Sequence, residues 1–168
     1  MMPFEYLGPE TDYRMLFVAG YLWDKIADKV IVDLDCLQAR LWHYLPHTYA
    51  EYISNDIYDH EDRPRAITFY QITDVEMAKQ LDRCDILLVF GHNGKDNANI
   101  SQSISRIVEK CHPQYIVLET IERYAIYIED ITRMLSGYTL DQNVRITPIV
   151  QLDRLHNRRI MLLRRSDV

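Results

Sequence analysis

The sequence predicts an α/β protein: a three-layer sandwich with a mostly parallel seven-stranded sheet, an N-terminal helix and an antiparallel final strand. Three observations predict this fold class. Short runs rich in β-branched residues alternate with segments of helical periodicity, as in βαβ units. The clearest runs, 29–35 and 85–90, lack the polar alternation of half-exposed strands, which is typical of strands covered on both faces. The last two runs are separated only by residues 149–158, which is too short for a crossover helix, so they should pair antiparallel.

The first half of the chain opens with an amphipathic segment. Apolar residues recur with helical spacing from Met15 to Ile26. Pro46 limits the next helix, because proline lacks the amide hydrogen that a helix interior needs. The predicted order is helix 10–28, strand 29–35, helix 37–46, strand 52–57, polar loop 58–65 and strand 66–70.

The second half repeats the alternation more clearly. Asp74 predicts a helix start, since its side chain can accept a hydrogen bond from an amide of the first turn. Gly137 suits the position just past a helix end. The predicted order is helix 75–83, strand 85–90, helix 98–110, strand 115–119, helix 124–135, strand 143–149 and strand 158–164.

Composition narrows the class of protein. A length of 168 residues with 48% hydrophobic and 26% charged residues is typical of one globular domain. The net charge of −6 argues against broad, sequence-independent binding to nucleic acid. No apolar run approaches the ~20 residues of a membrane helix, and the N-terminus does not resemble a signal peptide. Three cysteines indicate reduced thiols rather than a disulfide framework, so we expect a cytoplasmic protein.

The order of elements resembles the Rossmann-like fold of class I S-adenosylmethionine-dependent methyltransferases. In that family the first strand ends in Asp/Glu-x-Gly-x-Gly-x-Gly, and the matching stretch here is Asp33-Leu34-Asp35-Cys36-Leu37-Gln38-Ala39. The three glycine positions are therefore filled by Asp35, Leu37 and Ala39, so the chain resembles a divergent member. The resemblance covers roughly residues 10–165. It implies an N-terminal helical arm over 1–28 and a single methyltransferase-like domain over 29–168.

The resemblance also implies where S-adenosylmethionine would bind. Asp33 or Asp35 would accept from the methionine amine, and Asp56 would hold the ribose hydroxyls. Asp74 would lie near the adenine, and the loop that begins at Phe90 would face the methyl group. The residues assigned to cofactor binding are Asp33, Asp35, Asp56, Asp74, Phe90 and Gly91. Two alternatives stay open: Asp35 could cap the following helix, and Asp56 could be a solvated acid at a strand end.

His92, Asn93 and Glu119 are the residues that we place nearest to the chemistry. A histidine titrates near neutrality and could take a proton from an attacking hydroxyl or amine. Methyl transfer from a sulfonium needs mainly positioning, so such a base is optional. The alternatives are an exposed loop histidine and a solvated Glu119.

Two further groups of residues are candidate sites. His43 and His47 are four apart, but Pro46 lies between them and no second ligand pair accompanies them, so we predict no metal. The C-terminal segment is rich in arginine, which could meet an acidic partner or a phosphate. The alternative is that the stems of these arginines lie along an apolar strand. The arginines are Arg154, Arg158, Arg159, Arg164 and Arg165.

Three hypotheses for function follow. The first is a divergent methyltransferase acting on a small molecule or a protein side chain, with an open pocket beside Asp33 and Asp56. The second is a catalytically silent methyltransferase-fold protein that acts as a binding or partner subunit, with the pocket filled by Leu37. The third is a different α/β enzyme in which His92 and Glu119 approach a common point. We expect a small-molecule ligand and neither membrane nor nucleic acid as partner, while the tyrosines and the apolar N-terminal helix favour a homodimer.

Overall fold

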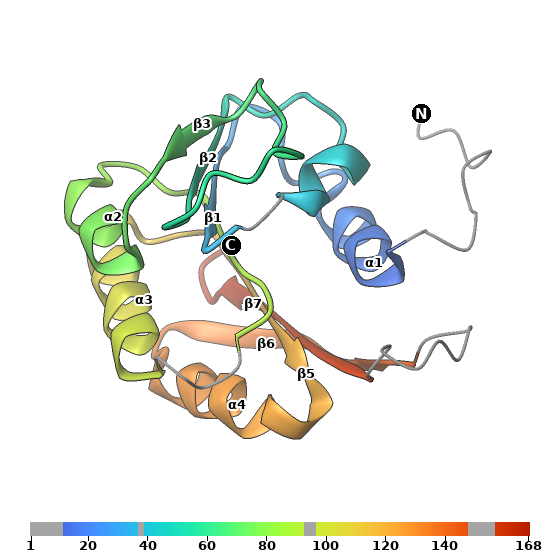
Figure 1. Cartoon of the computed structure of the whole chain (residues 1–168). Helices are drawn as coiled ribbons and strands as arrows, with labels where there is room; N and C mark the ends of the chain where they lie inside the picture. The colour runs from blue at the N-terminus through green and yellow to red at the C-terminus, as the bar shows by residue number, and fades with distance from the viewer. Residues whose placement is uncertain (1–11, 37–38, 93–96, 148–156) are drawn as a thin grey trace.

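The computed structural model describes residues 12–36, 39–92, 97–147 and 157–168. These segments form a seven-stranded sheet in the order β3-β2-β1-β4-β5-β7-β6 (Figure 1). Strands β1 to β5 pair in parallel, and β7 pairs antiparallel with both β5 and β6. The strands are β1 (Val30–Leu34), β2 (Glu51–Asn55), β3 (Thr68–Tyr70), β4 (Ile86–Val89), β5 (Tyr115–Ile121), β6 (Tyr138–Ile146) and β7 (Arg158–Arg165). The predicted fold class is confirmed, including the antiparallel final strand.

Helices cover both faces of this sheet (Figure 1). One face carries α2 (Asp74–Gln80), α3 (Asn97–Cys111) and α4 (Ala125–Met134), and the other carries α1 (Tyr13–Leu22) and the 3-10 helix η2 (Arg40–Tyr44). A further 3-10 helix, η3 (Glu122–Tyr124), precedes α4. Along β4, Leu87 packs in the cluster that contains Ile104 of α3, whereas Leu88 packs in the cluster that contains Leu22 of α1. Both faces of the strand are therefore buried, which explains the absence of polar alternation.

Helix α1 packs its apolar face against one side of the sheet. Met15, Val18, Ala19 and Leu22 are buried in the cluster on its side of the sheet. The helix is shorter than the predicted span 10–28, of which residues 10 and 11 lie outside the described segments. Its apolar face is thus not available to a second copy, and a homodimer stays a prediction without that support. In the part of the chain that the structure describes, no helix is long and apolar enough to cross a membrane.

The predicted helix 37–46 is wrong for its described residues. Only η2 forms there, because Ala39 adopts the left-handed conformation (φ 50°) and Leu45, before Pro46, is extended. Residues 37 and 38 lie outside the described segments.

The N-terminus of α2 also differs in detail from the prediction. Thr73, rather than Asp74, is its N-cap and forms a capping box with Glu76, because Asp74 already lies in the first turn.

Strand β6 begins at Tyr138, earlier than the predicted start at 143. It is an exposed edge strand of mostly polar residues, so it lacks the apolar run that marks the inner strands. An irregularity between Leu140 and Gln142 shifts its register against β7. Beyond this shift Val144 packs on the α1 side of the sheet, whereas Tyr138 packs on the other side. The predicted residues 148 and 149 lie outside the described segments.

Candidate functional site

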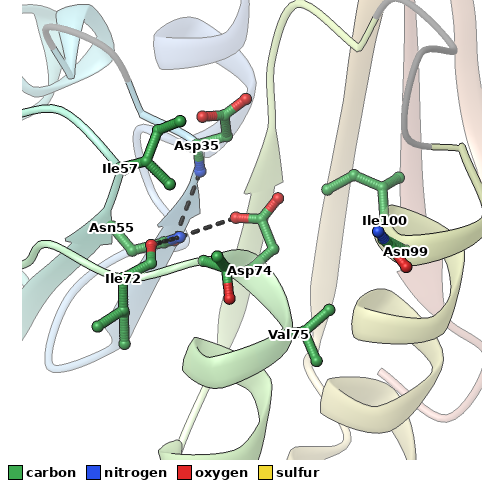
Figure 2. Close-up of a pocket in the computed structure, with 9 residues that line it drawn as sticks. Asp35, Asn55, Ile57, Ile72, Asp74, Val75, Asn99 and Ile100 are labelled. Atoms are coloured by element: carbon green, nitrogen blue, oxygen red, sulfur yellow. Dashed lines mark hydrogen bonds between the residues drawn. The ribbon is translucent and has the colours of Figure 1, made fainter.

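Two pockets open at the carboxyl ends of the parallel strands. The central pocket has a volume of about 360 Å³, and its lining residues are Arg14, Met15, Asp33, Asp35, Cys36, Arg40, Leu41, Phe90, Gly91, Ile121 and Arg158. The side pocket, shown in Figure 2, has a volume of about 190 Å³, and its lining residues are Asp35, Asn55, Ile57, Ile72, Thr73, Asp74, Val75, Asn99 and Ile100. Asp35 lines both pockets. The strand order reverses between β1 and β4, and ligands of open α/β sheets bind at such a point.

Asp33, the penultimate residue of β1, is a buried carboxyl in the wall of the central pocket. Its Oδ2 accepts a hydrogen bond from the Tyr52 hydroxyl at 2.7 Å. Its Oδ1 has no hydrogen-bond partner among the residues that the structure describes. Burial raises the pKa of Asp33 to about 7, and the negative charge of Asp35 adds to the effect while the Tyr52 hydrogen bond opposes it. An unsatisfied buried carboxyl oxygen is suited to accept from a cationic or neutral donor on a ligand.

The turn after β1 has two described residues in the left-handed conformation at positions where the motif has glycine. Asp35 (φ 52°) and Ala39 (φ 50°) adopt the left-handed conformation, and they occupy the first and third glycine positions of the motif. Asp35 does not cap η2, whose N-cap is Ala39 with no side-chain cap. Leu37, the expected plug of the pocket, lies outside the described residues. Burial, aided by the negative charge of Asp33, raises the pKa of the Cys36 thiol to about 12, so this thiol stays protonated at neutral pH.

The strain in this turn predicts that Asp35→Gly stabilises the protein. Glycine removes the clash of a Cβ in the left-handed region, and the gain should be about 0.5–1 kcal/mol in the free energy of unfolding. Urea unfolding at neutral pH measures it. Asp62→Gly is the matched control, because Asp62 is an exposed loop residue outside the positive-φ set and the same change there should destabilise. Equal or lower stability of Asp35→Gly would contradict the prediction.

Asn55, which ends β2, organises the side pocket (Figure 2). Its Nδ2 donates to Asp74 Oδ1 at 2.8 Å and to the Ile72 carbonyl at 3.1 Å, and its Oδ1 accepts from the Asp35 amide at 3.4 Å. One amide side chain therefore ties together the segments that follow β1 and β3. Sequence reasoning missed Asn55, although its place at a strand end was a usable signal.

Asp56, expected to hold the ribose, lies inside the protein instead of in a solvated position. It is 2% exposed, and its Oδ1 accepts from the Tyr58 amide at 2.9 Å. Its Oδ2 lies 3.5 Å from His60 Nε2. As far as the chain is described, the lining of the side pocket includes Asn55 and not Asp56.

Glu119 is a fully buried carboxylate on β5. Its Oε1 accepts from Arg14 Nη1 at 3.2 Å and from Arg158 Nη1 at 3.3 Å, and its Oε2 accepts from the Gly91 amide at 2.8 Å. The alternative of a solvated Glu119 is therefore wrong. The glutamate joins α1, β5, β7 and the loop after β4, and it holds Gly91 in the wall of the central pocket.

His92 is buried as well, at 8% exposure, so the alternative of an exposed loop histidine is wrong. Its amide donates to the Glu119 carbonyl at 3.3 Å, and its carbonyl accepts from the Thr120 hydroxyl. Its ring meets the edge of Tyr127, with the ring centres 6.0 Å apart. Phe90 and Gly91 line the central pocket as expected from their position, and Asn93 lies outside the described residues.

Metal ligation finds no support in the described segments, where no group of three or more His, Cys, Asp or Glu side chains is arranged to hold an ion. The ring of His47 stacks on Trp42 with the ring centres 4.2 Å apart. The C-terminal arginines diverge in their contacts: Arg159 pairs with Glu122 and Arg164 pairs with Asp141, while Arg158 lines the central pocket. Arg154 lies outside the described residues.

No protein-family model and no curated protein matches the chain. Solved structures do match over most of its length. An rRNA methylase from Streptococcus thermophilus is 8% identical, with a TM-score of 0.66 over 89% of this chain and 94% of that one. The chain has the class I methyltransferase fold.

Two further structures show the range of proteins that share this methyltransferase fold. A precorrin 8W decarboxylase from Methanobacterium thermoautotrophicum is 15% identical, with a TM-score of 0.69 over 90% of both chains. A magnesium protoporphyrin IX methyltransferase from Synechocystis, with bound S-adenosylmethionine, is 16% identical, with a TM-score of 0.60 over 91% of this chain and 76% of that one. At these identities the likeness establishes the methyltransferase fold, while the activity must be argued from the pockets.

Proposed function

We propose that this protein binds S-adenosylmethionine and transfers its methyl group to a small-molecule acceptor. The observation that carries the proposal is the unsatisfied Oδ1 of buried Asp33, a residue that lines the central pocket at the point where the strand order reverses. A buried carboxyl oxygen without a hydrogen-bond partner is costly, so a ligand that donates to it gains affinity there. The methionine amine of the cofactor is such a donor.

The two pockets divide the cofactor between them in this proposal. Asp33 holds the amine in the central pocket, and Asp35 lies between the pockets with its amide held by Asn55. Asn55 and Asp74 offer amide and carboxylate groups in the side pocket between the apolar side chains of Ile57 and Ile100. That mixture of polar and apolar groups suits a nucleoside, whose base is flat and apolar on its faces.

The cofactor supplies an activated methyl group, so the protein mainly has to position the acceptor and exclude water. Phe90 and Gly91 form the wall after β4, and Glu119 fixes the Gly91 amide from behind. Because Glu119 already accepts three hydrogen bonds, the proposal does not use it as a proton acceptor. No disulfide joins Cys36, Cys84 and Cys111, which fits the cytoplasmic location that is part of the proposal.

The proposal predicts micromolar binding of S-adenosylhomocysteine that Asp33→Asn weakens at least tenfold, about 1.4 kcal/mol. Asparagine keeps the shape and can still accept from Tyr52, but it removes the negative charge that the amine needs. Isothermal titration with S-adenosylmethionine and S-adenosylhomocysteine measures the effect. Asp85→Asn is the control, since Asp85 precedes β4 at the amino ends of the parallel strands and accepts a hydrogen bond from the Val30 amide.

The competing hypothesis is a catalytically silent methyltransferase-fold protein that acts as a binding or partner subunit. The buried, fully engaged Glu119 and the buried His92 favour it over an enzyme that needs a general base. It predicts no heat and no thermal shift with either nucleoside at millimolar concentration. That result would overturn the cofactor site, as would equal weakening by Asp33→Asn and Asp85→Asn.

A further inference from the structure

The side chains that line the central pocket differ in charge from one end of the pocket to the other. Four of its lining residues follow the strands in spatial order, with Asp33 on β1, Gly91 after β4, Ile121 on β5 and Arg158 on β7. Neighbouring strands lie about 4.8 Å apart, so the β1 and β7 positions are separated by about 14 Å. The pocket therefore has an acidic end at β1 and a basic end at β7, with the apolar side chain of Ile121 near the basic end.

The arginines in the wall of the central pocket are linked by shared acids. Arg14, Arg40 and Arg158 all line the pocket, and the acids bound to them are Asp12 and Glu119. In the part of the chain that the structure describes, three guanidinium groups of the pocket wall thus share two carboxylates. All three guanidinium nitrogens of Arg14 donate hydrogen bonds: Nε and Nη2 donate to Asp12, and Nη1 donates to Glu119.

Arg158, by contrast, uses one of its guanidinium nitrogens for hydrogen bonding within the described residues. Its Nη1 donates to Glu119, and its Nε and Nη2 have no partner among the residues that the structure describes. Burial lowers the pKa of Arg158, and the positive charge of Arg14 lowers it further while Glu119 raises it. A second anion beside Arg158 would offset both the desolvation of its guanidinium charge and the repulsion between the two guanidinium groups.

We infer that the methyl acceptor is an amphipathic oxyanion, a carboxylate or a phosphate monoester, whose anionic group binds Arg158 at the β7 end of the central pocket. The inference rests on the proposed function, because it assigns the acceptor to the end of the pocket away from Asp33. The planar fork of a guanidinium binds both oxygens of a carboxylate or phosphate at once. The apolar body of the acceptor lies against Phe90 and Ile121, toward the middle of the sheet.

The test compares matched anionic and neutral probes. Benzoate is paired with benzamide and phenyl phosphate with phenol, and each is titrated calorimetrically into the full chain with and without S-adenosylhomocysteine. We expect at least one anion to bind about tenfold more tightly than its neutral partner. Arg158→Gln should remove that preference, and Arg158→Lys, which keeps the charge, should retain part of it. Arg164→Gln is the control, because Arg164 lies at the other end of β7 and pairs with Asp141.

The outcomes separate this inference from the proposed function. If neither anion outbinds its neutral partner, or if the preference survives Arg158→Gln, the inference is overturned. A purely structural role of Arg158 beside Glu119 would lower stability in Arg158→Gln without changing the preference between probes. Binding of S-adenosylhomocysteine without any anion preference overturns only this inference. Anion preference without binding of S-adenosylhomocysteine overturns the proposed function and the role of the anion as methyl acceptor, and it leaves only the anion site at Arg158.

Discussion

Glu119→Ala is expected to lower the free energy of unfolding by about 3–5 kcal/mol. Glu119 is fully buried and is the carboxylate that Arg14 and Arg158 share. Alanine would leave two partly buried guanidinium groups close together with one counter-charge fewer, and it would leave the Gly91 amide without its acceptor. Removing one member of a buried ion cluster costs far more than the cluster contributes net, because the remaining charges stay desolvated. Chemical denaturation at neutral pH measures the loss.

Glu122→Ala is the matched control for this prediction. Glu122 also pairs with an arginine of β7, Arg159, but both side chains are partly exposed. An exposed pair contributes about 0–1 kcal/mol, since water screens it. If Glu119→Ala and Glu122→Ala cost the same, the burial of the Glu119 cluster would not have the energetic role assigned to it.

The second large effect is a pH dependence of stability that comes from Asp33. Its pKa is about 7 in the folded protein against 3.8 for an unperturbed aspartate, so the folded state binds the proton more tightly than the unfolded state. Stability is therefore highest below pH 3.8 for this group and falls as pH rises toward 7. The full difference corresponds to about 4 kcal/mol, of which about 2–3 kcal/mol is lost between roughly pH 5 and 8.

Asp33→Asn isolates that contribution. Asparagine cannot ionise, so the variant should lack this loss and become more stable than the wild type toward alkaline pH. Denaturation of both proteins at several pH values between about 5 and 8 gives the difference curve, in which the other acids cancel. Parallel curves for the two proteins would contradict the raised pKa. Asp85→Asn should leave the slope unchanged, because Asp85 lies at the other end of the strands and its side chain is hydrogen-bonded to the Val30 amide.

The same group links stability to the proposed ligand. An amine that binds Asp33 needs the carboxylate form, so affinity for S-adenosylhomocysteine should fall as pH drops below about 7. The empty site therefore lowers stability at neutral pH and a bound amine would offset that loss, as expected where one oxygen of a buried carboxyl has no hydrogen-bond partner among the described residues.

The sequence by itself determined the sheet and its connections. Strands buried on both faces, such as β1 and β4, appear as continuous apolar runs, and amphipathic helices appear as a 3.6-residue period. These signals are local, so one chain is enough to find them. The predicted start of the edge strand β6 is too late and the predicted helix 37–46 is wrong for its described residues. An exposed strand has no apolar run, and a left-handed residue such as Ala39 has no periodic signature.

The residues of the candidate site could be predicted only in part from the sequence. The sequence predicted Asp33, Asp35, Phe90 and Gly91 at strand ends and Asp74 after the third strand. All five line the two pockets. It could not choose between neighbours such as Asn55 and Asp56, because the direction of a side chain depends on how the strand ends and on what packs beside it. Only the tertiary structure decided that Glu119 serves Arg14, 105 residues away, and that Arg158 reaches the same pocket. Contacts at that separation leave no pattern in a local stretch of sequence, since they arise from strand order and not from periodicity.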